Sequence, residues 1–228
     1  MNWKPSLSAF ALAGLGLVAA AGTAAAAPAC EAPIMVGAVS TITGPADFSE
    51  VPEAAKAVFD RFNEAGGING CTIDYTIADD RADPAVATQA ARDLIDNRGV
   101  VALVGSASLL DCAVNSPTYN RRGVLSVQGL GVDAACFNSP SVAPVNVGPY
   151  TATTLSAYFA SEQLGAERFC AFFAIIGGTQ EAYANAIADW ERITGKTVHL
   201  VDNTLPLQGD LTAYVIKARD SGCDAVLT

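Results

Sequence analysis

The sequence predicts an α/β protein of doubly wound parallel sheets, and one stretch of the chain carries three observations in support. Apolar and small residues recur at helical spacing over 54–62 and stop at Gly66-Gly67, which can adopt the left-handed conformation that ends a helix. Apolar residues then alternate over 73–77, as in a strand. Asp83-Pro84 is typical of an N-cap followed by the first helical residue. A helix end, a strand and a helix start in this order form half of a βαβ crossover.

The same alternation continues along the chain and predicts two lobes. In the first lobe, strands are expected at 34–40, 72–78, 100–105 and 124–128, with helices at 52–65, 84–97 and 109–121. Residues 142–148 either add a last segment to this lobe or lead the chain out of it. The second lobe is expected to have helices at 151–164, 179–194 and 210–221, and strands at 168–176, 197–202 and about 223–228. Right-handed crossovers make both sheets parallel. We therefore expect a first lobe at 30–148 and a second, incomplete lobe at 149–228 of a truncated chain.

The first 26 residues are typical of a secretory signal peptide. Lys4 precedes an uncharged apolar run over 7–21, which is short for a membrane span of ~20 residues, and small residues of the A-x-A type follow it. Cleavage is expected near Ala26 or Ala27, which predicts an exported protein, periplasmic or associated with the cell surface. A lipoprotein signal ending at Cys30 is the alternative, although the residues before it lack the usual leucine.

Charge and cysteine content narrow the function further. The chain has 23 acidic and 13 basic residues and a net charge of −10, so it lacks the basic surface that nucleic-acid binding needs. Six cysteines in an exported chain favour disulfides over metal sites, and there is no C-x-x-C pair. Adjacency of the expected strands and of the segments that follow them favours three sequential pairs, with free buried cysteines as the alternative. These pairs are Cys30 with Cys71, Cys112 with Cys136 and Cys170 with Cys223.

The sequence offers no catalytic constellation, so we expect neither an enzyme nor a bound cofactor. His199 is the only histidine, lies between two apolar residues and is expected to be structural. The segment 129–134 fits the dinucleotide pattern G-x-G-x-x-A, but the turn residues at 136–138 and Pro140 interrupt the helix that should bind the pyrophosphate. Asp79, Asp80 and Asp83 could suggest a cation site, but Asp83 is accounted for as a helix cap. What remains is a binding module.

Ligands of doubly wound sheets bind beyond the carboxyl ends of the strands. In this chain that edge comprises 41–48, 106–109 and 128–133, with 177–183 of the second lobe opposite. Hydrogen-bonding and apolar candidates stand there, although the two serines could equally cap the helix that follows them. The candidates are Phe48, Ser106, Ser108, Gln128, Gly131 and Tyr183.

Three motifs resemble one family closely. They are Thr43-Gly44-Pro45, the run from Asn63 to Gly70 that reads NEAGGING, and the acidic segment 79–84 after the second strand. Together they are similar to extracytoplasmic substrate-binding proteins of branched-chain amino-acid type ABC transporters, with a type I periplasmic-binding-protein fold. The resemblance covers 34–228. It implies capture of a small polar solute, such as an amino acid or amide, between two lobes that close near 148–150, and permease subunits as partners.

The resemblance also implies ligand-binding positions. In the amino-acid binders, a serine after the third strand and a small residue and a threonine after the fourth strand hold the ligand. These positions fall on Leu109, Gly131 and Val132, so two hydroxyls are missing, which argues against a free amino acid as the ligand. Tyr183 matches the tyrosine of the second lobe, and the acidic residue that binds the ammonium group would lie beyond Thr228. A ligand-sensing ectodomain of a receptor or signalling system is the alternative with the same fold.

Overall fold

The computed structural model describes residues 30–228, and its first lobe is a five-stranded parallel sheet. The sheet order is β2-β1-β3-β4-β5. Its strands are β1 (Ile34–Ser40), β2 (Ile73–Asp79), β3 (Ala102–Ala107), β4 (Leu125–Leu130) and β5 (Val142–Pro144). The four predicted strands of this lobe are confirmed within two residues at each end. All strands run parallel, and β1 lies beside β3, so the order in which strands are added to the sheet reverses between β2 and β3.

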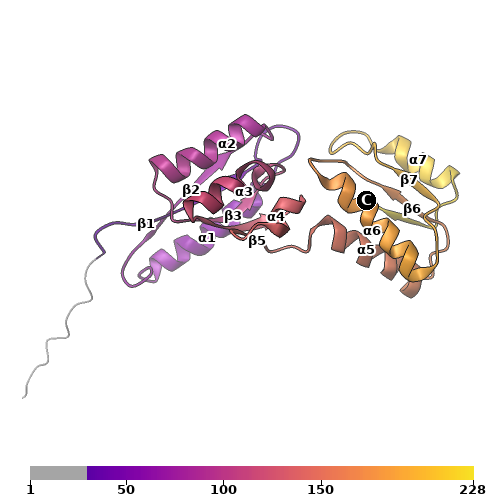
Figure 1. The fold of residues 1–228 in the computed structure, drawn as a ribbon, viewed down its shortest axis with the longest axis horizontal. Helices are drawn as coiled ribbons and strands as arrows, with labels where there is room; N and C mark the ends of the chain where they lie inside the picture. Colours follow the sequence, from indigo (N-terminus) through magenta and orange to yellow (C-terminus); the bar gives the residue numbers. More distant parts are fainter. Residues whose placement is uncertain (1–29) are drawn as a thin grey trace, which may run out of the picture.

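Helices cover both faces of this first sheet. They are α1 (Glu50–Glu64), α2 (Pro84–Arg92), α3 (Asp111–Arg122) and the short α4 (Ala134–Asn138). Figure 1 shows α1 on one face and α2 with α3 on the other. The core beneath α2 and α3 gathers Leu94, Leu103 and Tyr119, all buried. The layers therefore follow the doubly wound pattern that the sequence predicts.

Local sequence explains where these helices begin and end. The Asp83 carboxylate accepts hydrogen bonds from the backbone N–H groups of Ala85 and Val86, so Asp83 is the N-cap of α2 as expected. Gly67 follows α1 with a φ of +68°. A Cβ there would lie 2.1 Å from the Cys71 carbonyl oxygen, so only glycine fits this turn. After Arg92 the helix widens into a π-helical turn over Asp93–Asn97, which the sequence does not reveal.

The second lobe is a three-stranded parallel sheet of order β7-β6-β8. Its elements are α5 (Gly148–Tyr158), a π-helical turn (Phe159–Gln163), β6 (Phe169–Phe172), α6 (Thr179–Thr194), β7 (Leu200–Asp202), α7 (Thr212–Asp220) and β8 (Ala225–Leu227). Phe169 and Ala171 face a core with α5 and α6, whereas Cys170 and Phe172 face a core with α7. This alternation along β6 is that of a central strand buried on both faces.

Three disulfides join the cysteine pairs expected from the sequence. Cys30 is bonded to Cys71, Cys112 to Cys136 and Cys170 to Cys223, with Cα–Cα distances of 5.0, 5.0 and 5.8 Å. Each bridge lies within one lobe. The expected signal peptide falls on residues 1–26, which lie outside the described part of the chain.

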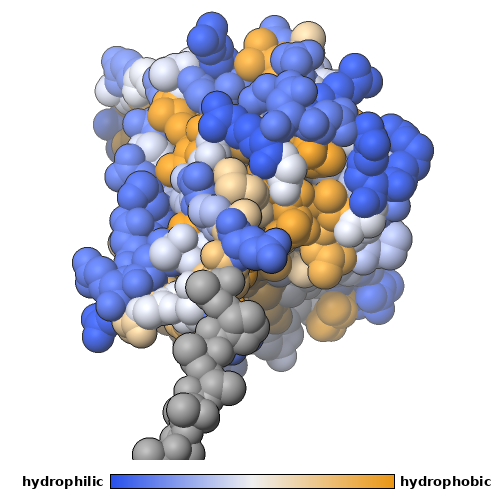
Figure 2. Space-filling model, turned by 90° about the vertical axis from the view of Figure 1, so that its left-hand side faces the viewer, coloured by the Kyte–Doolittle hydropathy of each residue, from blue (hydrophilic) through white to orange (hydrophobic). Residues whose placement is uncertain are grey.

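The surface of the first lobe is mixed in character. Figure 2 shows its outer end, where apolar residues form patches between hydrophilic ones. Val58 and Phe62 of α1 are 58% and 53% exposed. Helix α1 therefore keeps apolar side chains outside the core. None of the helices described between residues 30 and 228 has the length and apolar character that a membrane span requires.

Candidate ligand-binding site

A pocket of about 340 Å³ lies between the two lobes, beyond the carboxyl end of β4. Three segments form its wall: the β4–α4 connection with α4, the start of α5, and the first half of α6. The lining residues are Val132, Asp133, Ala134, Phe137, Val147, Gly148, Pro149, Tyr150, Thr151, Gly178, Glu181, Ala182 and Asn185. The volume is at the lower end of the range of small-molecule sites, about 300–1,000 Å³. The pocket can therefore hold a small solute.

The first-lobe wall of the pocket is held by a pair of amide hydrogen bonds. The Gly131 N–H donates to Asn146 Oδ1 at 2.8 Å, and Asn146 Nδ2 donates to the Gly131 carbonyl oxygen at 2.9 Å. A Cβ on Gly131 would lie 2.7 Å from the Pro144 side chain. Gly131 thus packs closely against β5 and the segment that follows it, and its backbone groups are bound to Asn146.

Helix α4 is a correction to the sequence analysis, which interprets 136–138 as turn residues. Asp133 caps the helix: its carboxylate accepts a hydrogen bond from the Ala135 N–H at 2.7 Å. The helix ends at Asn138, two residues before Pro140. A single capped turn tolerates the nearby proline because Pro140 lies outside it. This turn brings Phe137 to the pocket.

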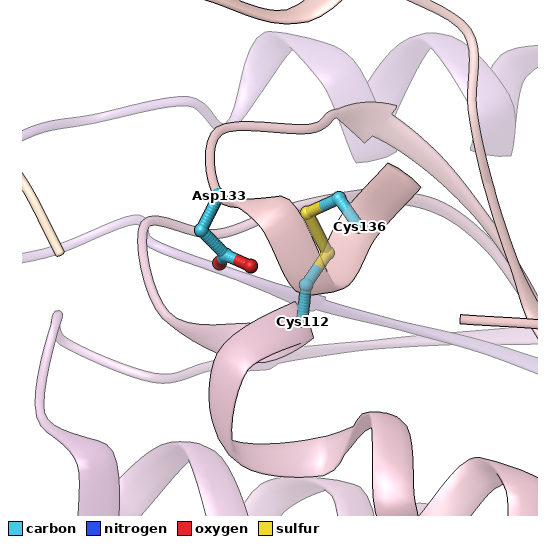
Figure 3. A group of neighbouring side chains, drawn as sticks. All are labelled: Cys112, Asp133 and Cys136. Carbon is cyan, nitrogen blue, oxygen red and sulfur yellow. A yellow bond between two sulfur atoms is a disulfide. The ribbon is translucent and has the colours of Figure 1, made fainter. Parts of the chain in front are cut away.

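Asp133 is the most unusual polar residue of the pocket wall. Its side chain lies beside the Cys112–Cys136 disulfide (Figure 3), and the residue is only 6% exposed. Its Oδ2 has no hydrogen-bond partner among residues 30–228. Burial raises the pKa of this carboxyl, although nearby backbone N–H groups, that of Ala135 foremost, act in the opposite direction. Both sulfurs are within 4.8 Å of the carboxylate, but they are bonded to one another and so are not free to bind a metal.

The two candidate serines point into the first lobe. Ser106 is fully buried, and its Oγ accepts a hydrogen bond from the Val39 N–H of β1. Ser108 donates to the Asp80 carboxylate and accepts from the Asp111 N–H at 2.8 Å. Ser108 therefore caps α3, which is the alternative left open by the sequence, whereas Ser106 binds the neighbouring strand.

Gln128 and Leu109 are likewise engaged within the lobe. Gln128 is fully buried, and its Nε2 donates to the carboxylate of Asp111 at 2.7 Å. Leu109 is 3% exposed, and its backbone N–H donates to Thr41 Oγ1. Both residues are therefore buried beneath the carboxyl-end edge of the first sheet and are not exposed at its surface.

Of the three remaining candidates, one lines the pocket between the lobes and two lie elsewhere. Val132 lines the pocket. Phe48 is half-buried after β1, where its N–H donates to the Thr41 carbonyl oxygen. Tyr183 stacks on Phe173, with ring centroids 4.1 Å apart, and belongs to a separate hollow of the second lobe. Tyr183 therefore does not line the pocket between the lobes, and its position across a cleft from the first-lobe candidates stays a prediction.

Sequence reasoning missed several residues that line the pocket on the second lobe. They are Gly178, which precedes α6, and three residues of the helix, Glu181, Ala182 and Asn185. These three are spaced by one and three residues and so share one helix face. That spacing is visible in the sequence, but nothing in the sequence identifies which face of the helix turns toward the first lobe.

Two lobes of parallel α/β structure, joined by one connection in the described chain and enclosing a pocket between them, constitute the type I periplasmic-binding-protein-like fold. The chain belongs to the periplasmic binding protein family, whose family model matches residues 33–228.

Comparison with individual proteins agrees with this family. Leu/Ile/Val-binding protein homolog 3 of Brucella melitensis biotype 1 is 31% identical over 115 residues, which are 50% of this chain and 31% of that protein. The substrate-binding protein LivJ of Streptococcus pneumoniae, solved in complex with isoleucine, superposes with a TM-score of 0.70 at 20% identity. A solute-binding protein of an ABC transporter from Rhodopseudomonas palustris BisB5, solved with 3,4-dihydroxybenzoic acid, gives a TM-score of 0.71 at 17% identity.

Both structural matches cover 85% of this chain, and they cover 56% and 53% of the solved proteins. The chain therefore spans a little over half the length of these proteins. At these identities the likeness shows the fold.

Proposed function

We propose that this chain is the solute-binding component of an ABC importer and captures a small polar molecule between its two lobes. The observation that carries the proposal is the pocket between the lobes, whose wall combines α4 of the first lobe with α6 of the second. A ligand in this position touches both lobes at once. It therefore stabilises the closed arrangement by its differential affinity for it. Membership of the periplasmic binding protein family supports the same function.

In this proposal the lobes comprise residues 30–148 and 149–228 and move about the segment 148–150. Gly148 begins α5 with a φ of +75°, a conformation that favours glycine. A Cβ at Gly148 would lie 2.4 Å from the Phe137 ring. The hinge segment therefore packs directly on the pocket wall, so rotation of the second lobe would reshape the pocket.

The candidate residues would have two roles, contact with the solute and support of the surrounding structure. Val132 would contact the solute, because it lines the pocket. Ser106, Ser108 and Gln128 would keep the edge of the first sheet in shape, because their polar groups already bind neighbouring loops and strands. Phe48 and Tyr183 would contribute only if the lobes rearranged on closure.

The proposed place of action is outside the cytoplasm, with permease subunits in the membrane as partners. Three disulfides support export, because disulfides persist in oxidising compartments. The mass of the intact protein purified from an expressing cell tests this step. We expect loss of the first 26 residues or so and an unlipidated Cys30, because its sulfur is bonded to Cys71.

A thermal-shift screen tests solute capture. The panel contains amino acids, amides, urea and small carboxylates at millimolar concentration. We expect at least one class to raise the melting temperature, and Ala182→Phe, which fills the pocket, to abolish that shift. Ala188→Phe is the matched control, because Ala188 is exposed on the same helix and does not line the pocket. Equal shifts in both variants would show that the solute binds elsewhere.

Capture for import also requires delivery. Stimulation of the partner transporter's ATPase by the loaded protein, and by neither component alone, would support an importer. A solute that binds but never stimulates a transporter would favour the ligand-sensing alternative.

A further inference from the structure

The pocket carries acidic side chains from both lobes and no basic one. Asp133 stands on the first-lobe wall and Glu181 on the second-lobe wall. Among the thirteen residues that line the pocket there is no lysine, arginine or histidine. A ligand in this pocket therefore lies between two carboxylates that belong to different lobes.

Neither carboxylate is paired with a basic side chain in the described chain. Arg192 lies in the last turn of α6, at the other end of the helix from Glu181, and its guanidinium is paired with Asp189. Asp189 also accepts a hydrogen bond from the Tyr150 hydroxyl at the pocket rim. No cationic side chain of the described residues therefore occupies the place beside these two acids, which a cationic ligand could take.

Several backbone N–H groups at the edge of the first sheet are already engaged within the lobe. The backbone N–H groups of Leu109 and Gly131 donate to Thr41 and Asn146. Those at the start of α3 donate to Ser108, and that of Ala135 donates to Asp133. A carboxylate buried here would lie beside the like charges of Asp133 and Glu181, which is costly.

Apolar groups make up much of the remaining wall. Val132, Phe137, Val147 and Pro149 contribute side chains without hydrogen-bonding groups. Tyr150 adds an aromatic ring whose hydroxyl is already bound to Asp189. The wall therefore suits a ligand with an apolar body and a single polar end.

We propose that the pocket selects a small organic ammonium ion with an apolar body and excludes solutes whose anchoring group is a free carboxylate. This inference rests on the proposed function and names the solute class for the same pocket. The Asp133 charge acts on the ligand mainly through space, because its carboxylate lies beside the disulfide (Figure 3), while Glu181 is exposed and free to contact the ammonium group. In a partly buried site such an interaction is much stronger than in water.

Calorimetry with three probes that share one carbon skeleton tests the selection. The probes are 3-methylbutylamine, leucine and 4-methylpentanoate, which carry an ammonium group, both groups and a carboxylate alone. We expect the purified chain to bind the amine best, leucine at least about tenfold more weakly and 4-methylpentanoate undetectably, since each factor of ten corresponds to about 1.4 kcal/mol.

Two variants report on the carboxylates separately. Asp133→Asn keeps the cap of α4, because asparagine caps as well as aspartate, but removes the charge. Glu181→Gln removes the charge of the exposed acid on α6. We expect each variant to lose about tenfold in affinity for the amine, and Asp74→Asn, which removes one exposed charge that does not line the pocket, to lose nothing. Melting temperatures without ligand verify that each variant is folded.

The outcomes separate this inference from the proposed function. Tighter binding of 4-methylpentanoate or leucine than of the amine, or amine binding unaffected in both pocket variants, would overturn the ammonium selection and leave solute capture standing. Absence of binding for all three probes and for the whole thermal-shift panel would overturn both.

Discussion

The Gln128 side-chain amide donates a hydrogen bond to the Asp111 carboxylate at 2.7 Å, deep in the first lobe. Both residues are fully buried. Tyr119 and Asn115 donate to the other oxygen of the same carboxylate, and in the described chain no cation pairs with Asp111. Three neutral donors therefore hold a buried acid beneath the edge of the sheet.

Burial raises the pKa of Asp111 above its ordinary value, despite the hydrogen bonds that lower it. The folded protein then holds this proton more tightly than the unfolded chain. Its contribution to the free energy of unfolding falls as pH rises from about 4 toward neutrality. We expect Asp111→Asn to remove this component, so that the wild type loses stability relative to the variant over that range.

Chemical denaturation at several pH values measures this difference. Asparagine keeps an oxygen for Tyr119 and Asn115, and its amide can donate to Gln128 Oε1, which lacks a partner among the described residues. Asp74→Asn, at an exposed position, provides the reference. A stability difference that does not vary with pH would mean that Asp111 titrates normally in the folded protein.

Asp202 in the second lobe should behave in the opposite sense. Lys217 donates to its carboxylate at 2.6 Å, and Thr204 donates to its other oxygen, so the pKa of Asp202 is lowered from 3.8 to about 2. This stabilisation is present above the ordinary pKa and is lost as pH falls through about 2. We expect Asp202→Asn to destabilise the lobe at neutral pH and to match the wild type at about pH 2, as followed by Trp190 fluorescence. A constant difference down to that pH would contradict the assignment.

Trp190 fluorescence can also distinguish how each disulfide affects the unfolding of the second lobe. It is buried among Phe169 and its neighbours in the second lobe and is the only tryptophan after residue 29. Replacing Cys170 and Cys223 by alanine opens a loop of 53 residues, which costs about 4 kcal/mol by chain entropy. We expect the Trp190 transition to shift strongly in this variant. Replacing Cys112 and Cys136 should change it little, and equal shifts would show that the lobes unfold as one unit.

Gly67 should be far less replaceable than Gly70, although both have positive φ values. Left-handed backbone costs a non-glycine residue about 1–2 kcal/mol. At Gly67 a Cβ would also collide with the Cys71 carbonyl, whereas at Gly70 it would meet open space. We expect Gly70→Ala to cost about 1 kcal/mol and Gly67→Ala clearly more in denaturant titrations. Similar losses would mean that the turn relaxes easily.

Local patterns were sufficient for most of the fold and insufficient for most of the site. Alternating apolar residues and Asp83-Pro84 predict strands and a helix start because those signals are carried by neighbours in sequence. The inward turn of Ser106, Ser108 and Gln128 depends on partners 17 to 67 residues away, Val39, Asp80 and Asp111. Such long-range hydrogen bonds leave no local trace, so polar residues at a strand end are as consistent with a scaffold as with a binding surface.

The disulfides have a further consequence for how the chain matures. Each cysteine is joined to the next one along the sequence, and no bridge spans another. During synthesis, and during the export that we propose, the N-terminal end emerges first, so both cysteines of each pair have emerged before those of the following pair. An oxidant that links each newly emerged thiol to its immediate predecessor would therefore reach the native set directly, without an isomerase to correct mismatched bonds.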